Sequence, residues 1–179
     1  MRIPTSSPLV FCLALLLGQA AGAAAQSIDW AKQAGGSCAF PCSIGFHSAS
    51  AIAVDGDGNS VVTGHITGTV VFGRGELNET TLVSEGNSLF VAKFDIHGAL
   101  LWARAVAGDL RGQAIAVDAA GNSYVAGSFR FGAAFPETLL IGPASGVHDF
   151  FVAKYDPDGH FAWARQGGPD FIPACRAAG

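Results

Sequence analysis

Short stretches of apolar residues, each followed by a turn sequence rich in Asp, Gly and Asn, recur along this chain. In residues 51–54, small Ala side chains alternate with branched Ile and Val, a pattern typical of a strand that is packed on both faces. Residues 55–59 read DGDGN and predict a hairpin turn, because Asp accepts backbone hydrogen bonds and Gly takes positive φ. Residues 60–64 then predict the second strand, and the chain as a whole predicts an all-β fold.

The pattern is copied within the chain. Residues 51–64 return at 114–127, 63 positions later, with 10 of 14 residues identical. Residues 90–104 return at 151–165, 61 positions later, with 9 of 15 identical. Copying at a nearly constant spacing indicates one supersecondary unit that needs a neighbour to bury its apolar face.

Each copy contains the signals for four short strands. In the first copy these are 51–55, 60–64, 90–94 and the segment that carries Trp102. The stretches 73–86 and 132–146 match least well between the copies. Four antiparallel strands in a repeated unit of about 60 residues predict a β-propeller blade, because solenoid coils are shorter and a sandwich would not predict such close copying.

Tryptophan recurs at one position of this unit. Trp102 and Trp163 each follow an Asp by seven residues, with a Gly between, and Trp30 begins a similar Trp-Ala-basic string. We expect the three indoles to pack between neighbouring blades, and a ligand-stacking role is the alternative. Residues 27–34 then predict a lone fourth strand of a preceding blade. The recurring Lys32, Arg104 and Arg165 are expected on outermost strands, where charge discourages edge pairing.

The strings around 51–64 and 90–104 resemble the bacterial β-propeller repeat family often called SBBP repeats. The resemblance extends over residues 27 to about 168. It implies an exported or cell-surface protein built from propeller repeats, and it transfers no catalytic residue. The shorter Asp-x-x-Gly-x-x-x-Trp spacing also resembles the tryptophan motif of quinoprotein propellers.

The predicted organisation is an incomplete ring of two four-stranded antiparallel blades with one extra N-terminal strand. A closed propeller has four to eight blades. The expected segments are a signal peptide, a strand with a Cys-containing linker, two blades and a tail, with boundaries at 1–25, 26–50, 51–108, 109–168 and 169–179. Two apolar outer faces would remain, so we expect either a ring of several chains, a homo-oligomer, or a larger propeller.

The N-terminus has the features of a secretory signal peptide. Arg2 precedes the apolar run 9–17, which is too short to span a bilayer stably, and small residues end at Ala25. Cleavage there leaves 14 acidic and nine basic residues, since one of the ten is lost. A net charge near −5 gives no electrostatic reason to expect nucleic acid or an anionic membrane as a partner. We expect a secreted or cell-surface bacterial protein with no membrane span in its mature form.

Three cysteines lie outside the signal peptide. Export makes a disulfide between Cys38 and Cys42 the favoured interpretation, with Cys175 left over. A metal pair is the alternative, but neither His nor Cys nearby in the sequence would complete a tetrahedral set.

Catalytic motifs are absent from the sequence. The five histidines form no zinc motif, and the nucleophile elbow and phosphate-binding patterns do not occur. Asp55, Asp57 and Asn59 alternate like the start of a calcium loop, but Ile66 stands where a bidentate Glu is needed. We expect no resident cofactor or metal. Asn78-Glu-Thr80 fits a glycosylation acceptor, which we read as chance in a bacterial protein.

Two functions from different classes remain. The first is a non-enzymatic module that binds a protein or glycan partner, which the repeat, the export signal and the missing catalytic motifs favour. The second is a piece of a propeller enzyme, such as a quinoprotein-like oxidoreductase or a lyase. A bound quinone or turnover of polysaccharide would indicate the second.

Overall fold

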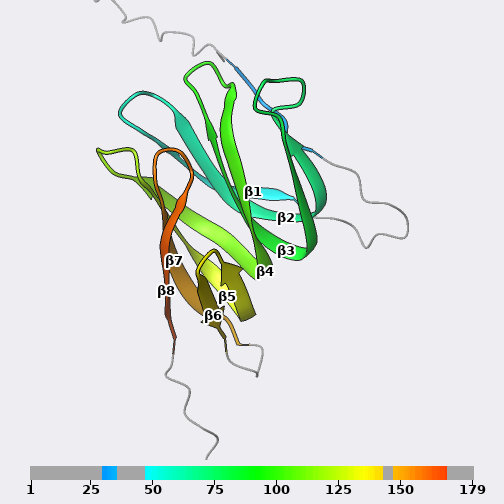
Figure 1. Cartoon of the computed structure of the whole chain (residues 1–179), viewed down its shortest axis with the longest axis vertical. Coiled ribbons are helices and arrows are strands. Elements are labelled where there is room, and N and C mark those ends of the chain that lie inside the picture. The colour runs from blue at the N-terminus through cyan, green and yellow to red at the C-terminus, as the bar shows by residue number, and fades with distance from the viewer. Residues whose placement is uncertain (1–29, 36–46, 143–146, 169–179) are drawn as a thin grey trace, which may run out of the picture.

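The computed structural model describes residues 30–35, 47–142 and 147–168, and these form an open antiparallel sheet (Figure 1). The strand order is β1-β2-β3-β4-β5-β7-β8, with β6 paired to β5. No helix occurs in these residues, and hence none that could span a membrane. The all-β prediction is therefore confirmed. The strands are β1 Ser48–Val54, β2 Ser60–Phe72, β3 Thr80–Phe94, β4 Leu100–Val117, β5 Ser123–Phe135, β6 Thr138–Ile141, β7 Asp149–Tyr155 and β8 Phe161–Gly167.

β4 connects two groups of four strands. Its first part, 100–106, pairs with β3, and its second part, 107–117, pairs with β5. We call β1, β2, β3 and 100–106 the first unit, and 107–117, β5, β7 and β8 the second unit. In Figure 1 the long green strand β4 runs from one group of strands into the other. The two units are thus joined by a continuous strand.

The copied sequences adopt copied pairing. In the first unit Ala51 pairs with Thr63, and a bulge lies just before Ala51. In the second unit Ala114 pairs with Ala126, again with a bulge before it. Because the same register returns at both places, the internal sequence repeat is also a repeat of hydrogen bonding.

The main core lies between the two units. Val61, Leu89 and Val91 of the first unit have no exposed surface, and they cluster with Phe151 and Ala153 of the second, which are equally buried. Successive residues of a strand point to opposite faces. The alternate side chains of the first unit therefore form a second cluster on its far face: Ile66, Val70, Phe72, Phe90, Ala92, Phe94, Leu100 and Ala103.

The first strand of each unit differs in burial between the copies. Ile115 and Val117 pack against the core between the units. Their counterparts Ile52 and Val54 are each 61% exposed. The prediction that β1 is packed on both faces is therefore wrong for the first copy, because no strand described here covers that face of β1.

Three other boundaries differ from those expected from the sequence. The expected break between blades, near 109–113, lies inside β4 and pairs with β5. The poorly matching stretches contain strand as well, since β3 begins at Thr80 and β6 occupies 138–141. The described part of the expected N-terminal strand, 30–34, is not strand, and only the next residue, Gly35, forms a bridge with Val71. In all three cases pairing with a neighbouring strand decides the structure, and local sequence signals do not report it.

Gly127 of β5 offers a direct test of the copied bulge. A Cβ at this position would overlap the Arg111 carbonyl oxygen and press on the Phe151 ring. We expect Gly127→Ala to lower the free energy of unfolding by about 1–3 kcal/mol, as overpacking of a close contact does. Gly56→Ala is the matched control, because a Cβ there meets nothing within 4 Å. Denaturant unfolding of both variants measures the difference, and equal stabilities would contradict the close approach.

Candidate functional site

Four turns of the chain share one construction. They begin at Asp55, Asp95, Asp118 and Asp156, and in each the Asp amide donates to the carbonyl four residues on, and the Gly amide donates to the Asp carbonyl. The Asp carboxylate accepts further hydrogen bonds from the amides two and four residues later, at 2.7–3.0 Å. These carboxylates therefore hold their own backbone.

Two of these turns are each contacted by a tryptophan from an earlier part of the chain. The Trp30 Nε1 donates to the Ile96 carbonyl at 3.1 Å, and a Cβ on Gly98 would lie 2.6 Å from the indole. The Trp102 Nε1 donates to the Pro157 carbonyl at 2.9 Å, and a Cβ on Gly159 would lie 2.5 Å from its indole. The same donor, acceptor and glycine thus occur twice, one repeat apart.

Two basic side chains complete the second of these contacts. The Arg104 Nε donates to the Gly159 carbonyl at 3.0 Å, and the Lys93 Nζ lies 3.4 Å from the Pro157 carbonyl. Sequence reasoning gave Arg104 only a role in discouraging edge pairing. Its recurrence two residues after each Trp was the available signal for a contact that follows the indole.

Lys93 is also half of a buried ion pair. Its Nζ lies 2.9 Å from the Asp55 Oδ2, and the two side chains are only 6% and 3% exposed. Burial raises the pKa of the Asp55 carboxyl, but hydrogen bonds from Asn59, Lys93 and the amide of Asp57 outweigh it and lower the pKa to about 2. The pair ties the first turn of the repeat to β3.

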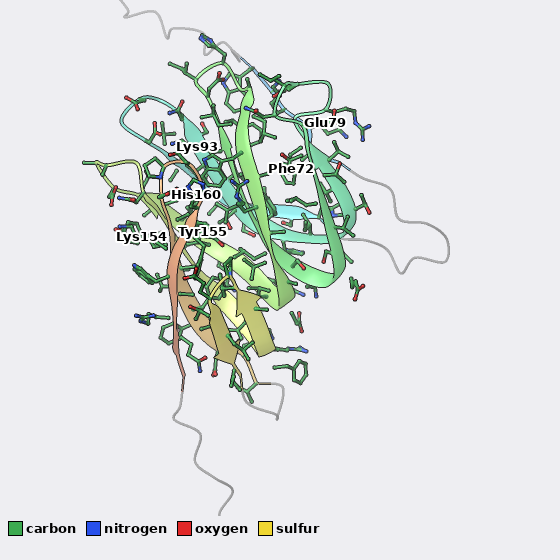
Figure 2. The ribbon with its side chains drawn as sticks, viewed as in Figure 1. Phe72, Glu79, Lys93, Lys154, Tyr155 and His160 are labelled. Carbon is green, nitrogen blue, oxygen red and sulfur yellow. The ribbon has the colours of Figure 1, made fainter. Side chains whose placement is uncertain are left out.

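The second unit repeats this surface without a turn from the described residues upon it. We call Tyr124, Phe150, Val152, Lys154, Trp163 and Arg165 its tryptophan face; Figure 2 labels Lys93 and Lys154, the matching lysines of the two units. Phe150 is 59% exposed, whereas its counterpart Leu89 is fully buried. Trp163 is half-buried, packing edge-on against Tyr124 with ring centroids 6.3 Å apart.

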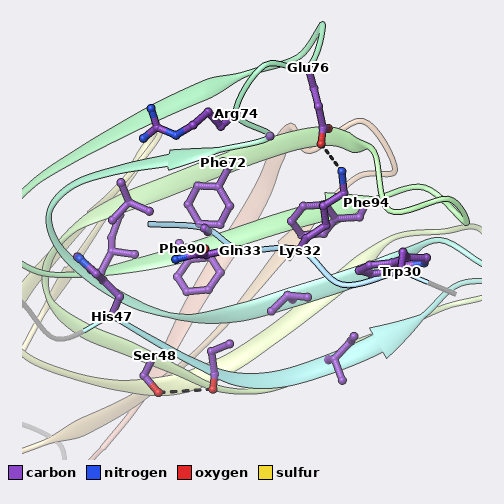
Figure 3. Close-up of a pocket in the computed structure, with 17 residues that line it drawn as sticks. Trp30, Lys32, Gln33, His47, Ser48, Phe72, Arg74, Glu76, Phe90 and Phe94 are labelled. Atoms are coloured by element: carbon purple, nitrogen blue, oxygen red, sulfur yellow. Dashed lines mark hydrogen bonds and ion pairs between the residues drawn. The ribbon is translucent and has the colours of Figure 1, made fainter. Parts of the chain in front are cut away.

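The first unit carries the complementary surface at the other end. We call Phe90, Phe94 and the turn 95–98 its turn face. Trp30 lies over it, 6.3 Å from the Phe94 ring. Between the segment 30–35 and the sheet is a groove of about 360 Å³ with an aromatic floor (Figure 3). Its lining includes Phe72, Phe90, Phe94, Ile66, Val62 and His47, and the Lys32–Glu76 ion pair at 2.5 Å closes one side.

The remaining residues singled out from the sequence are not gathered at this surface. Cys38, Cys42 and Cys175 lie outside the described residues. Asp55 of the calcium-like string uses both carboxylate oxygens internally, on amides, Asn59 and Lys93. The Asn78 side-chain amide donates to the Leu100 carbonyl at 3.1 Å.

One group of potential metal ligands occurs at a turn. Asp156, Asp158 and His160 place ligand atoms within 4.8 Å of one another. The Asp156 Oδ1 already accepts two amides, and its Oδ2 lies 3.0 Å from the His160 Nδ1. The group is accounted for as an Asp turn with a histidine on its outer side.

Comparison with known proteins leaves the family open. No family model matches the chain, and a search of curated proteins finds no significant match. The resemblance of 51–64 and 90–104 to SBBP repeats stays an expectation from sequence.

The contact between indole and glycine predicts an asymmetric effect of two glycine substitutions. Gly159 and Gly75 have nearly equal positive φ, 77° and 78°, but only at Gly159 would a Cβ meet Trp102. Both Ala variants bear the backbone strain of positive φ, about 1 kcal/mol or more. We expect Gly159→Ala to be the less stable, and quenching by acrylamide to show greater access to Trp102. Equal loss in both variants would reduce Gly159 to a turn residue.

The buried ion pair predicts a specific acid dependence. The pKa of Asp55 in the folded protein, about 2, lies below its ordinary value of 3.8. The stabilisation is therefore complete above that ordinary value and is lost as the pH falls toward about 2. We expect Asp55→Asn to remove this part of the acid dependence, since Asn keeps the turn acceptor but not the charge.

Denaturant titrations from about pH 5 to about pH 2 measure the effect, with Asp57→Asn, an exposed residue of the same turn, as the control. Parallel stability curves for the wild type and Asp55→Asn would show that the ion pair contributes nothing to acid resistance.

Proposed function

We propose that this chain is a secreted, non-enzymatic β-propeller repeat module that binds a protein or glycan partner. In this proposal each four-stranded unit is one propeller blade. The observation that carries it is the repeated contact in which Trp30 and Trp102 lie on the glycine turn of the next unit. Contact only between sequence neighbours is the organisation of repeat proteins.

The packing of the two units supports the blade interpretation. Trp102 and Val91 on one face of the first unit meet Phe151 and Tyr155 on the opposite face of the second. Radially arranged four-stranded sheets pack in this manner. The resemblance to SBBP repeats points to the same architecture and to an exported protein.

The exposed apolar surface supports an interaction function. Phe150 at 59% exposure and Ile52 and Val54 at 61% lie on the two outer faces of the pair of units. Contiguous exposed apolar residues mark interaction surfaces in soluble proteins. Aromatic residues beside Lys154 and Arg165 suit a partner that offers carbonyl or hydroxyl acceptors and an apolar patch.

The chemistry of the turns supports a structural role for their carboxylates. Asp95 and Asp156 each accept two backbone amides. A carboxylate committed in this way serves poorly as a general base, because its lone pairs are occupied by backbone amides.

A binding screen on immobilised glycans and peptides tests the function. We expect a ligand that wild-type protein binds and that Phe150→Ser binds at least about tenfold more weakly, because the exposed ring supplies apolar contact area. Leu77→Ser is the matched control, since Leu77 is 100% exposed and lies in the β2–β3 loop of the first unit, whereas Phe150 lies on the second.

Two results would count against the proposal. Equal binding by the wild type and both variants would show that the outer face with Phe150 does not contact the ligand. Turnover of a polysaccharide, or a bound quinone seen in the absorption spectrum, would instead establish the propeller enzyme.

A further inference from the structure

The chain contains both halves of an interface that it has already made once internally. The tryptophan face of the first unit is covered by the turn face of the second, with Trp102 against Gly159 and Lys93 near Pro157. Each unit exposes the face whose counterpart is buried between the units. The second unit presents Trp163, and the first unit presents the turn that ends in Gly98.

We infer that a second copy of this chain docks head to tail, with its Trp163 on the Gly98 turn of the first copy in place of Trp30. The inference rests on the proposed function and names its partner. In the internal interface the indole nitrogen bonds the carbonyl of Pro157, the residue after the turn Asp. The equivalent acceptor for Trp163 is the carbonyl of Ile96, which Trp30 now occupies.

Side-chain charge agrees with this pairing. Arg104 lines the same small cavity between the units as Glu137. In the first unit Glu76 lies in the β2–β3 loop, which takes the place of the β5–β6 turn that contains Glu137. Glu76 pairs with Lys32, which corresponds to Arg104 in the Trp-Ala-basic string. In the docked pair Arg165 takes the position of Lys32 beside Glu76, so basic meets acidic again.

Apolar exposure is relieved at both ends by the same contact. Leu89 and Val91 are fully buried under the second unit, whereas Phe150 is 59% exposed. On the opposite surface Ile52 and Val54 are 61% exposed, and their counterparts Ile115 and Val117 pack against the core. One contact covers Phe150 of one copy and Ile52 and Val54 of the other, and burial of this apolar area drives the association.

The segment 30–35 competes with the second copy for the same site. Trp30 holds it through one indole hydrogen bond and the Phe94 contact. Elsewhere it makes the single bridge of Gly35 to Val71 and the ion pair of Lys32, and residues 31–34 are exposed. We expect Trp163 to bind this face more tightly than Trp30, because β8 is a fully paired strand, whereas 30–35 is a short extended segment.

The contact uses two different surfaces, so it is heterologous. Such contacts produce closed rings when the rotation per copy closes and open filaments when it does not. The inference therefore predicts discrete assemblies or filaments made of whole copies, with each internal copy using both outer faces.

Sedimentation over a range of protein concentrations tests the inference with five forms of the full chain, one of them a control. We expect Trp30→Ala to associate at about tenfold lower concentration than the wild type, because the competing indole is gone. Trp163→Ala should remain monomeric where the wild type associates, and the double variant should behave like Trp163→Ala. Val83→Ser is the control and should match the wild type, because Val83 is 70% exposed and points to the opposite side of β3 from Leu82, which packs on the outer face.

A peptide spanning residues 30–35 gives a second measurement that needs no folding of the Trp30 variant. Added to wild-type protein, the peptide should dissociate the assemblies, because it occupies the Gly98 turn. The same peptide with Ala for Trp should have no effect.

The outcomes separate this inference from the proposed function. The head-to-tail contact would be overturned if the double variant associated as readily as Trp30→Ala. It would also be overturned if the peptide failed to dissociate the assemblies. A chain that stays monomeric at all concentrations, yet loses a glycan or peptide ligand on Phe150→Ser, would overturn the contact and leave the interaction function standing. Monomers that bind no ligand would overturn both.

Discussion

The contact between an indole and the glycine turn of the next repeat is the constraint on which the rest of this structure depends. The Trp102 ring lies so close to Gly159 that a methyl group would not fit between them, and its nitrogen is bonded to the same turn. This contact sets the separation of the two units and so decides which side chains are buried. Leu89 is buried and Phe150 exposed because, among the residues that the structure describes, only Leu89 has a following unit in contact with it. The outer surfaces of the molecule are consequences of the same rule.

The Asp turns make that contact possible. Each carboxylate accepts hydrogen bonds from amides of its own turn, which fixes the turn so that the carbonyls of Ile96 and Pro157 can accept from the indoles. Asp55 goes further and neutralises Lys93, whose charge is costly to bury unless it is paired and hydrogen-bonded. In the second unit Tyr124 stands where the first has Val61, and its hydroxyl bonds to Asp118 while Lys154 lies over its ring. An aromatic residue on the outer face thus replaces the buried ion pair.

The two units are not separate domains. β4 belongs to both, and the core cluster that contains Phe151 also contains Leu89, so the main core is shared between the two units. Stability in such arrays is the sum of each unit and its interfaces with its neighbours. One interface therefore contributes to the stability of both units. On the turn face of the first unit, the short segment 30–35 covers only part of the surface and leaves a groove, whereas the same face of the second unit is covered by a whole sheet. Burial of the phenol of Tyr155 at this interface raises its pKa above the ordinary range.

Sequence alone determined the strands around Val61 and Val125, the turns at Asp55 and Asp118, and the period of the repeat, because turn chemistry and alternation are local properties. It also pointed to Trp30 and Trp102 as packing sites, whereas the described residues place Trp163 against Tyr124 of its own unit. Only the tertiary structure decided that residues 109–113 are strand, that Arg104 reaches the Gly159 carbonyl, and that β1 has an exposed apolar side. Each of these depends on which surface lies opposite, and local sequence signals do not specify that surface. The strands and turns of each repeat thus follow from its own sequence, whereas the burial of its side chains depends on the neighbouring unit.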